Sequence, residues 1–303
     1  MHYRNLGNTG IQVSEVGMGG NRLGQDYAPD EHWIKLVRRA VDLGVTLFDT
    51  SGSYGWGRSE EMLGRALGNR ADVYVATKMS RLRETGEREF SAARMIETVE
   101  SSLRRLQRDQ IDIYQLHSPD REALKRYDWA EGMARLKTQG KIRVGGVAVN
   151  SADDGIWLIE QGLVDMLQIT YSIFVTEPEE KLFDLAEQHG VGLLVRMPLA
   201  RGVLTGKFTP GEPVPDGHRA RLDGERAQAN IQKAETLRSI AEQYAGGMTR
   251  MAHHFSLTPS AVSAIIPGAR TMVQVEENVA ASNGLGLPGV VREQIEQVRR
   301  TWV

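Results

Sequence analysis

Residues 73–116, VYVATKMSRLRETGEREFSAARMIETVESSLRRLQRDQIDIYQL, contain one complete copy of the pattern that decides the fold. Apolar runs at 73–77 and 111–116, rich in β-branched residues, predict two short strands. Four apolar residues between them recur at helical spacing: Ile96, Val99, Leu103 and Leu106. Ser91 precedes them as a candidate helix cap. The order strand, helix, strand predicts a parallel β-α-β unit whose strands are covered on both faces.

The same alternation runs along the rest of the chain. Further apolar runs predict strands near 15–19 and at 45–49, 143–149, 164–169, 191–196 and 262–266. Helical patterns are predicted at 33–40, 178–189 and 274–282. Asp30 is a candidate cap for the first of these helices, and Gly44 a candidate stop. Eight strand–helix units favour a closed (β/α)8 barrel, the TIM barrel, over an open doubly wound sheet.

Two segments interrupt this rhythm. Residues 1–14 predict a short β-hairpin before the first barrel strand, placed to close the barrel bottom. Residues 200–227 form a long polar stretch with several glycines and prolines, and loops of this length are usually functional or mobile. No internal repeat or linker is evident, so we expect residues 1–303 to form a single domain.

Composition excludes several classes of protein. The 303 residues are 41% hydrophobic and 25% charged, as in an average soluble globular protein. The formal net charge of −2 gives no indication of nucleic-acid binding. Cysteine is absent, which excludes disulfides, thiolate metal sites and cysteine nucleophiles. No secretory signal and no long apolar run are present, so we expect a cytoplasmic protein without a membrane span.

Polar residues stand where three successive predicted strands end. These are Asp49, Lys78 and His117, and Tyr54 follows in the glycine-rich segment SGSYGWG. In a barrel the carboxyl ends of the strands meet on one face, where active sites lie. A single charge at such a position usually has a structural role. Three in succession, with a tyrosine on the adjoining loop, predict a catalytic site.

The chemistry of these four residue types is coherent. Free tyrosine is a weak acid at neutral pH, but a neighbouring lysine ammonium stabilises the phenolate that proton donation leaves behind. A carboxylate would hold that lysine, and a neutral histidine would orient a carbonyl oxygen. Such a set protonates an oxygen on which negative charge develops. It lacks the nucleophile and base of an acyl-transfer triad.

Six segments of the chain, in this order, resemble the aldo-keto reductase superfamily. They are YRNLGNTGIQVSEVGMG, FDTSGSYGWGRSEEMLGRAL, VATK, QLH, MPLARGVLTGKF and IIPGARTMVQVEEN. The resemblance covers nearly the whole chain. It implies a (β/α)8 barrel that binds NADPH across its C-terminal face and reduces an aldehyde or ketone, a small-molecule carbonyl substrate.

The resemblance also implies a role for each residue of the tetrad. Tyr54 is the general acid in reduction, Lys78 activates it and is held by Asp49, and His117 positions the substrate carbonyl. The cofactor supplies the hydride. Trp56, two residues after Tyr54, is a candidate substrate-binding residue, with a packing role as the alternative.

The cofactor residues implied by the resemblance lie in several segments. They are Gly20, Asn21, Asn150, Gln168, Arg196, Leu199, Arg201, Gly202, Leu204, Gly268, Arg270, Gln274, Glu277 and Asn278. Gln168 matches the residue that binds the carboxamide, and Arg270 suits a 2′-phosphate, which predicts NADP. Two positions depart from the common pattern. Asn150 is displaced by one residue, and Arg196 stands where many members stack a tyrosine on the nicotinamide.

Other interpretations remain open. A non-catalytic NADPH-binding sensor or regulatory protein of the same fold is one, and a barrel isomerase or aldolase that uses Lys78 as a Schiff base is another. His253 and His254 face different sides of a predicted helix and indicate surface or packing roles, so no metal is expected. Gly17, Gly19 and Gly20 lack the GxGxxG spacing of a Rossmann dehydrogenase.

Overall fold

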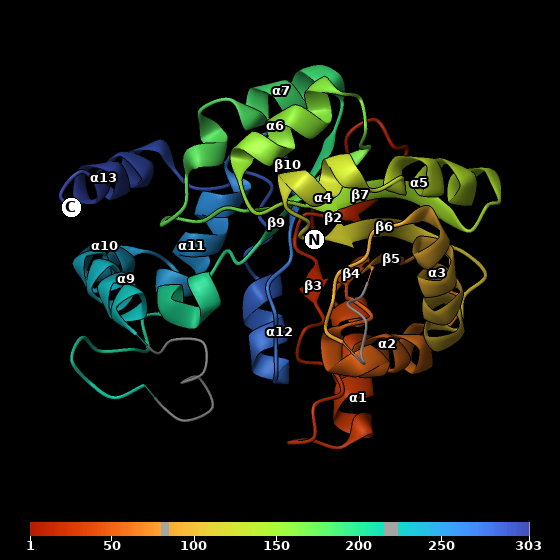
Figure 1. The fold of residues 1–303 in the computed structure, drawn as a ribbon. Coiled ribbons are helices and arrows are strands. Elements are labelled where there is room, and N and C mark those ends of the chain that lie inside the picture. Colours follow the sequence, from red (N-terminus) through yellow and green to blue (C-terminus); the bar gives the residue numbers. More distant parts are fainter. Residues whose placement is uncertain (80–84, 215–223, 303) are drawn as a thin grey trace.

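The computed structural model describes residues 1–79, 85–214 and 224–302, and its centre is a curved sheet of eight parallel strands in chain order (Figure 1). The strands are β3 (Met18–Gly19), β4 (Leu47–Asp49), β5 (Tyr74–Lys78), β6 (Ile111–His117), β7 (Ile142–Ala148), β8 (Met166–Thr170), β9 (Gly192–Arg196) and β10 (Val262–Ile265). Backbone bonds between the first and last strand segments close the sheet. Gly17 N donates to Ile265 O (2.8 Å) and Gly19 N to Pro267 O (2.9 Å). The predicted (β/α)8 barrel is confirmed.

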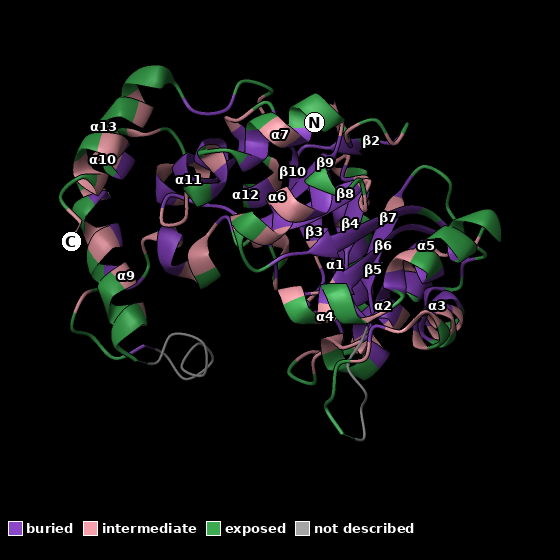
Figure 2. Cartoon of the chain, turned by 45° about the horizontal axis from the view of Figure 1, so that its top comes forward, coloured by how far each residue is buried: buried purple, intermediate pink, exposed green. Residues whose placement is uncertain are grey.

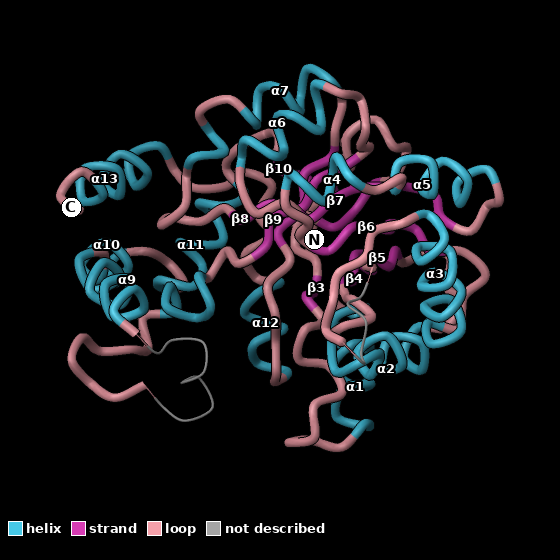
Figure 3. The backbone as a smooth tube through the Cα atoms, viewed as in Figure 1, coloured by secondary structure: helices cyan, strands magenta, loops and turns pink. Residues whose placement is uncertain are grey.

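Helices surround this sheet, which Figure 3 shows at the centre of the molecule. They are α1 (Asp30–Asp42), α2 (Arg58–Leu67), α3 (Ala92–Leu106), α4 (Arg121–Arg126), α5 (Trp129–Thr138), α6 (Ala152–Glu160), α7 (Leu182–His189), α9 (Glu225–Thr236), α10 (Arg238–Gln243), α11 (Gly247–Leu257), α12 (Met272–Val279) and α13 (Gly289–Arg299). Short 3-10 helices are η1 (Tyr54–Gly57), η2 (Glu177–Glu179) and η3 (Ala200–Thr205). None of the helices in the described ranges has the length and apolarity needed to cross a membrane.

The buried residues form two layers. One lies between the helices and the sheet, and the strands are buried on both sides (Figure 2). The other fills the barrel with one side chain from each of several strands: Leu47, Ala76, Ile113, Val144, Met166, Leu194 and Ala264. Continuous apolar strands are therefore required, because each strand contributes to both layers.

The N-terminal hairpin closes the bottom of the barrel, as predicted. Strands β1 (Tyr3–Asn5) and β2 (Gln12–Ser14) pair antiparallel, and Leu6, between them, joins the inner layer. Leu6 lies directly against Gly192. A Cβ atom there would approach Leu6 Cδ1 to 2.5 Å, so only glycine lets the hairpin pack this closely.

The two predicted helix caps have different outcomes. Ser91 caps α3, where its side chain accepts a hydrogen bond from Arg94 N (3.3 Å). The prediction for Asp30 is wrong, because α1 has its N-cap at Pro29 and Asp30 is already helical. The Asp30 carboxylate instead bonds to Arg58 and Arg65 of α2. It therefore links two helices rather than capping its own.

Three other boundaries differ from the predicted ones. The helix predicted at 178–189 is divided into η2 and α7, because Lys181 between them has an extended φ of −151°. The helix predicted at 274–282 starts earlier, at Met272, where the Thr271 side chain caps it. The predicted loop 200–227 begins with η3 and ends at α9, and its residues 215–223 lie outside the described ranges.

His253 and His254 lie inside α11 and are both buried, so the predicted packing role is confirmed and the surface role is not. His254 Nδ1 bonds to the Tyr244 hydroxyl (2.6 Å). Neither ring nitrogen of His253 has a hydrogen-bond partner within the described part of the chain. Burial lowers the pKa of His253 to about 3, and the charges of His254 and Arg250 act in the same direction.

A neutral buried His253 makes stability depend on pH. In the unfolded chain the imidazole binds a proton near pH 6.5, whereas in the folded chain it stays neutral down to about pH 3. The contribution of His253 to the free energy of unfolding is therefore complete above pH 6.5 and is lost as the pH falls toward 3. The free energy of unfolding of the unmutated protein decreases when the pH is lowered from about 7 to 5. We expect this decrease to be smaller by about 2 kcal/mol in His253→Leu. Urea denaturation at the two pH values measures it. Exposed His189→Leu is the control, and equal pH dependence in wild type and His253→Leu contradicts the prediction.

Candidate active site

The first two predicted site residues form a buried ion pair at the carboxyl ends of neighbouring strands. Lys78 Nζ donates to both oxygens of Asp49, at 2.7 Å to Oδ1 and 2.6 Å to Oδ2, and to Thr50 O at 2.9 Å. The Lys78 and Asp49 side chains are only 1% and 4% exposed. Two charges removed from water at this depth need each other, because either one alone would be strongly destabilising.

Tyr54 and His117 lie beside this pair. The Tyr54 ring centroid is 5.4 Å from Lys78 Nζ, and the Tyr54 and His117 rings meet edge to face with centroids 5.7 Å apart. His117 Nδ1 lies 3.0 Å from Ser51 Oγ, which fixes the plane of the imidazole. The structure thus brings all four residues of the predicted tetrad together at the C-terminal face of the barrel.

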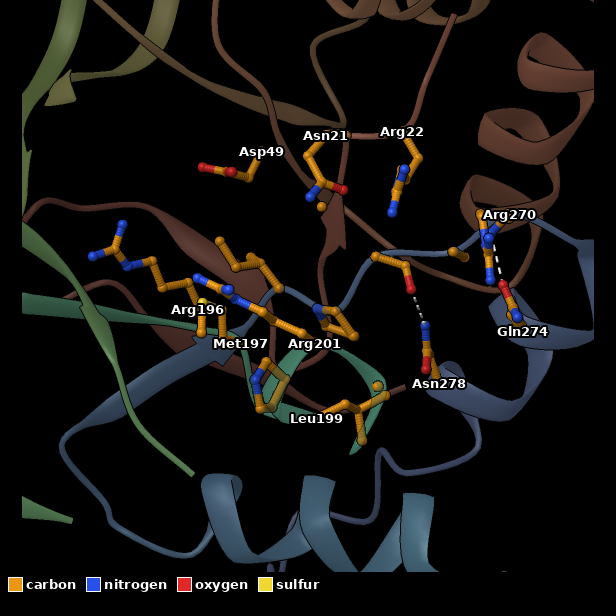
Figure 4. Close-up of a pocket in the computed structure, with 18 of the residues that line it drawn as sticks. Asn21, Arg22, Asp49, Arg196, Met197, Leu199, Arg201, Arg270, Gln274 and Asn278 are labelled. Carbon is orange, nitrogen blue, oxygen red and sulfur yellow. Dashed lines mark hydrogen bonds between the residues drawn. The ribbon is translucent and has the colours of Figure 1, made fainter. Parts of the chain in front are cut away.

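A cavity of about 690 Å³ opens beside Tyr54 and Asp49 and extends to α12. It is lined by most of the predicted cofactor residues: Gly20, Asn21, Gln168, Arg196, Leu199, Arg201, Gly202, Gly268, Arg270, Gln274, Glu277 and Asn278. Figure 4 shows Asp49 and Arg196 at one end and Arg270 and Gln274 at the other. The cavity is long, and its two ends are formed by segments far apart in the sequence.

Three predicted residues lie elsewhere. Leu204, which belongs to η3, is fully buried in the core. Asn150 is exposed, and its side chain contacts Ser118 and Arg196 rather than the cavity. Trp56 is 46% exposed and does not line the cavity. Lys78 and His117 are also not among the residues that line this cavity: Lys78 is buried, and His117 is half-buried.

The cavity also contains residues that sequence reasoning missed. They are Gly19, Arg22, Met197, Pro198, Thr205, Lys207, Thr249, Ile266, Pro267 and Ala269. Most of these residues lie within or next to the segments that resemble the aldo-keto reductase superfamily, so their position in the sequence could have indicated that they line the cavity. Thr249 on α11 had no such indication, because only the packing of α11 against η3 and α12 brings it there.

Basic side chains dominate the cavity. They are Arg22, Arg196, Arg201, Lys207 and Arg270, against the acidic Asp49 and Glu277. Lys207 and Arg270 line the same cavity; burial lowers the pKa of Lys207, and repulsion by Arg270 lowers it further. Asp49 is already paired with Lys78. The cavity therefore suits a ligand with several negative charges.

The loop after β9 has an unusual backbone. Met197, Ala200 and Arg201 have φ values of 59°, 46° and 61°, and Gly202 has 95°. Residues other than glycine rarely adopt this region, and such strain gathers at ligand-binding loops. Successive left-handed residues also turn neighbouring N–H groups toward one side, which favours anions.

The opposite wall of the cavity is held by side chain to backbone bonds. Gln274 Oε1 accepts from Arg270 N (2.8 Å), and Asn278 Nδ2 donates to Gly268 O (3.4 Å), as Figure 4 shows. His32 Nε2 lies 2.8 Å from Arg270 O. The segment from Gly268 to Arg270 is thus held from both sides. Within the described ranges, no cluster of three or more His, Asp or Glu side chains is arranged to hold a metal ion.

Comparison with known proteins places this geometry in a family. The model of the aldo/keto reductase family matches residues 15–300. The chain belongs to the aldo/keto reductase family. Among curated relatives of this aldo/keto reductase, L-galactose dehydrogenase of Arabidopsis thaliana is 32% identical over an alignment of 311 positions, which covers 97% of this chain and 92% of the relative.

Two further matches cover nearly the whole chain. The NADH-specific methylglyoxal reductase of Escherichia coli (strain K12) is 31% identical to this aldo/keto reductase over an alignment of 308 positions, which covers 92% of each chain. The holo form of aldo-keto reductase AKR11C1 from Bacillus halodurans superposes with a TM-score of 0.83 at 30% identity, covering 98% of this chain and 96% of that one. Sequence and structure therefore agree on the family over nearly the full length.

Proposed function

We propose that this aldo/keto reductase reduces an aldehyde or ketone to an alcohol with NADPH, and that Tyr54 donates the proton. The observation that carries the proposal is the buried Lys78–Asp49 pair beside the Tyr54 ring. A desolvated cation is costly to hold in place. At this position it stabilises the phenolate that Tyr54 becomes when it gives up its proton.

The cavity fits a phosphate-bearing dinucleotide. Its basic side chains outnumber its acidic ones, and its length joins Tyr54 to the segment around Arg270. A bound nicotinamide cofactor supplies the hydride. Gln168, in the middle of β8, would bind the carboxamide, and the loop of Leu199, Arg201 and Gly202 would bind the pyrophosphate.

The residues of the chain then supply the proton and the orientation. His117, held by Ser51, orients the carbonyl oxygen toward the Tyr54 hydroxyl. A cofactor bound here would supply hydride to the carbonyl carbon, and Tyr54 would donate its proton to the carbonyl oxygen, where negative charge develops. Lys78 then faces the phenolate, and Asp49 keeps Lys78 in place.

A panel of small carbonyl compounds tests the proposal, with NADPH consumption followed by absorbance. We expect multiple turnovers with at least one aldehyde or ketone. NADPH binding without turnover across the panel supports the alternative of a non-catalytic cofactor-binding protein. Trapping of a substrate on Lys78 by borohydride, without cofactor, supports the Schiff-base alternative instead.

Cofactor choice gives a separate prediction. A guanidinium bonds a 2′-phosphate bidentately, and a charge-assisted contact contributes about 1.5–3 kcal/mol, roughly ten- to a hundredfold in affinity. We expect Arg270→Ala to weaken NADPH binding by that factor while leaving NADH binding nearly unchanged, as measured by fluorescence titration. Arg104→Ala, on the outer helix α3, is the control. Equal dissociation constants for NADPH and NADH in the unmutated protein contradict the assignment.

A further inference from the structure

Arg196, the last residue of β9, is fixed by four neighbours at the C-terminal face of the barrel. Its Nε donates to Thr170 Oγ1 (3.1 Å) and Nη1 to Ser118 Oγ (3.2 Å). Its Nη2 donates to Val149 O (2.8 Å) and to Asn150 Oδ1 (3.4 Å). These bonds reach the ends of three other strands. The guanidinium therefore has one position, and it cannot swing out to solvent without losing all of them.

The charge of Arg196 is not paired. No carboxylate oxygen of the described residues forms an ion pair with it, and every neighbour that it bonds is neutral. Burial lowers the pKa of Arg196, while Tyr54 and Asp49 act in the opposite direction through their charge. Asp49 is already bound to Lys78 by two hydrogen bonds. Arginine stays protonated in proteins, so a fixed positive charge remains at this wall of the cavity.

This charge lies at the reactive end of the cavity. Arg196 and Tyr54 line the same space, and Arg270 lies at its far end (Figure 4). Under the proposed function, on which this inference rests, the hydride donor approaches the carbon whose oxygen contacts Tyr54. Reacting atoms approach to about 3–3.5 Å before transfer. The nicotinamide ring therefore belongs at the Arg196 end, and the adenosine phosphate at the Arg270 end.

We propose that Arg196 makes the site discriminate between the two redox forms of its cofactor, so that NADPH binds more tightly than NADP⁺. The two forms are identical except at the nicotinamide ring, which is neutral when reduced and carries one positive charge when oxidised. The fixed charge of Arg196, at the same end of the cavity as the ring, repels only the oxidised ring. At the effective dielectric of such sites this repulsion corresponds to about tenfold in affinity or more.

The preference has a consequence for the direction of the reaction. Reduction of the carbonyl produces NADP⁺ at the same site, where Arg196 weakens its binding and favours its release. The same preference raises the midpoint potential of the bound cofactor by about 30 mV for each tenfold difference, because the couple transfers two electrons. An aromatic residue at this position would carry no such charge.

Fluorescence titration of the whole protein with NADPH and with NADP⁺ tests the proposal. We expect the NADP⁺ dissociation constant to exceed that of NADPH by about tenfold or more in the unmutated protein. Arg196→Gln is expected to bring the ratio to within about threefold of unity, because the amide keeps some hydrogen bonds but no charge. Arg196→Lys keeps the charge and is expected to keep most of the preference.

Arg270→Ala is the matched control, because it removes a cation from the same cavity at the end where the two redox forms are identical. It should weaken both forms by the same factor and leave the ratio unchanged. Equal affinities in the unmutated protein overturn the inference even if no Arg196 variant folds. So does an unchanged ratio in folded Arg196→Gln. Failure to bind either cofactor would instead overturn the proposed function, and this inference with it.

Discussion

Replacement of Tyr54 by phenylalanine is expected to reduce carbonyl turnover by roughly 10²–10⁴-fold, the usual contribution of a positioned acid. The substitution keeps the ring that lies against His117 and over Lys78, and it removes only the hydroxyl. Affinity for NADPH should therefore barely change. Steady-state rates with the best substrate of the panel, together with cofactor titration, measure the two effects separately.

The control for this variant is Tyr3→Phe. Tyr3 lies in the hairpin at the bottom of the barrel, where its hydroxyl donates to Gly44 O (3.2 Å). Tyr3→Phe removes one phenol hydroxyl, as Tyr54→Phe does, but at the opposite end of the barrel. Carbonyl turnover by Tyr3→Phe should therefore remain near that of the unmutated protein. Near-normal turnover in Tyr54→Phe would end the assignment of Tyr54 as the acid.

Replacement of Lys78 by methionine is expected to abolish most of the turnover and to change its pH profile, because the phenol loses its cationic neighbour. Asp49→Asn should act in the same direction but more mildly, since Lys78 keeps its bond to Thr50 O. Rates across a pH series measure both effects. An active Lys78→Met variant with an unaltered pH profile contradicts the role of Lys78.

The Lys78→Met variant can lose turnover either because the protein is less stable or because the reaction lacks the lysine. Lys78→Met leaves the buried Asp49 carboxylate without its cation, and breaking a buried pair in this way costs about 3–5 kcal/mol. The double variant Lys78→Met, Asp49→Asn removes both charges and should regain stability in urea without regaining turnover. Lys137→Met, which breaks the surface pair with Asp165, is the control and should change neither strongly. Recovery of turnover in the double variant would show that Lys78 is only structural.

The sequence predicted the barrel because each strand must be apolar on both faces. Runs such as 73–77 and 111–116 show this apolar pattern within their own residues, so it can be recognised without knowing which strands pair. The tetrad could be predicted for a related reason. Asp49, Lys78 and His117 each follow an apolar strand, and the parallel topology brings the ends of such strands to one face. The structure then placed these residues together with Tyr54.

Predictions that depended on a partner distant in the sequence were less successful. Asp30 has the residue type and position of a helix cap, but Arg58 and Arg65 of another helix bind its carboxylate. The end of a helix depends on such contacts, because capping and cross-helix pairing compete for the same oxygens. Thr249 lines the cavity because of the way α11 packs against its neighbours, which no local sequence pattern predicts.

The sequence by itself therefore determined the strand order, the inner and outer layers of the barrel and the residue types at its C-terminal face. The spacing of apolar residues along each segment indicates which of its faces is buried. Only the tertiary structure decided that Arg196 is held by Thr170, Ser118, Val149 and Asn150, and that no carboxylate of the described residues pairs with it. Whether a charge is paired depends on the distance between side chains from different strands, and that distance exists only after the barrel has closed.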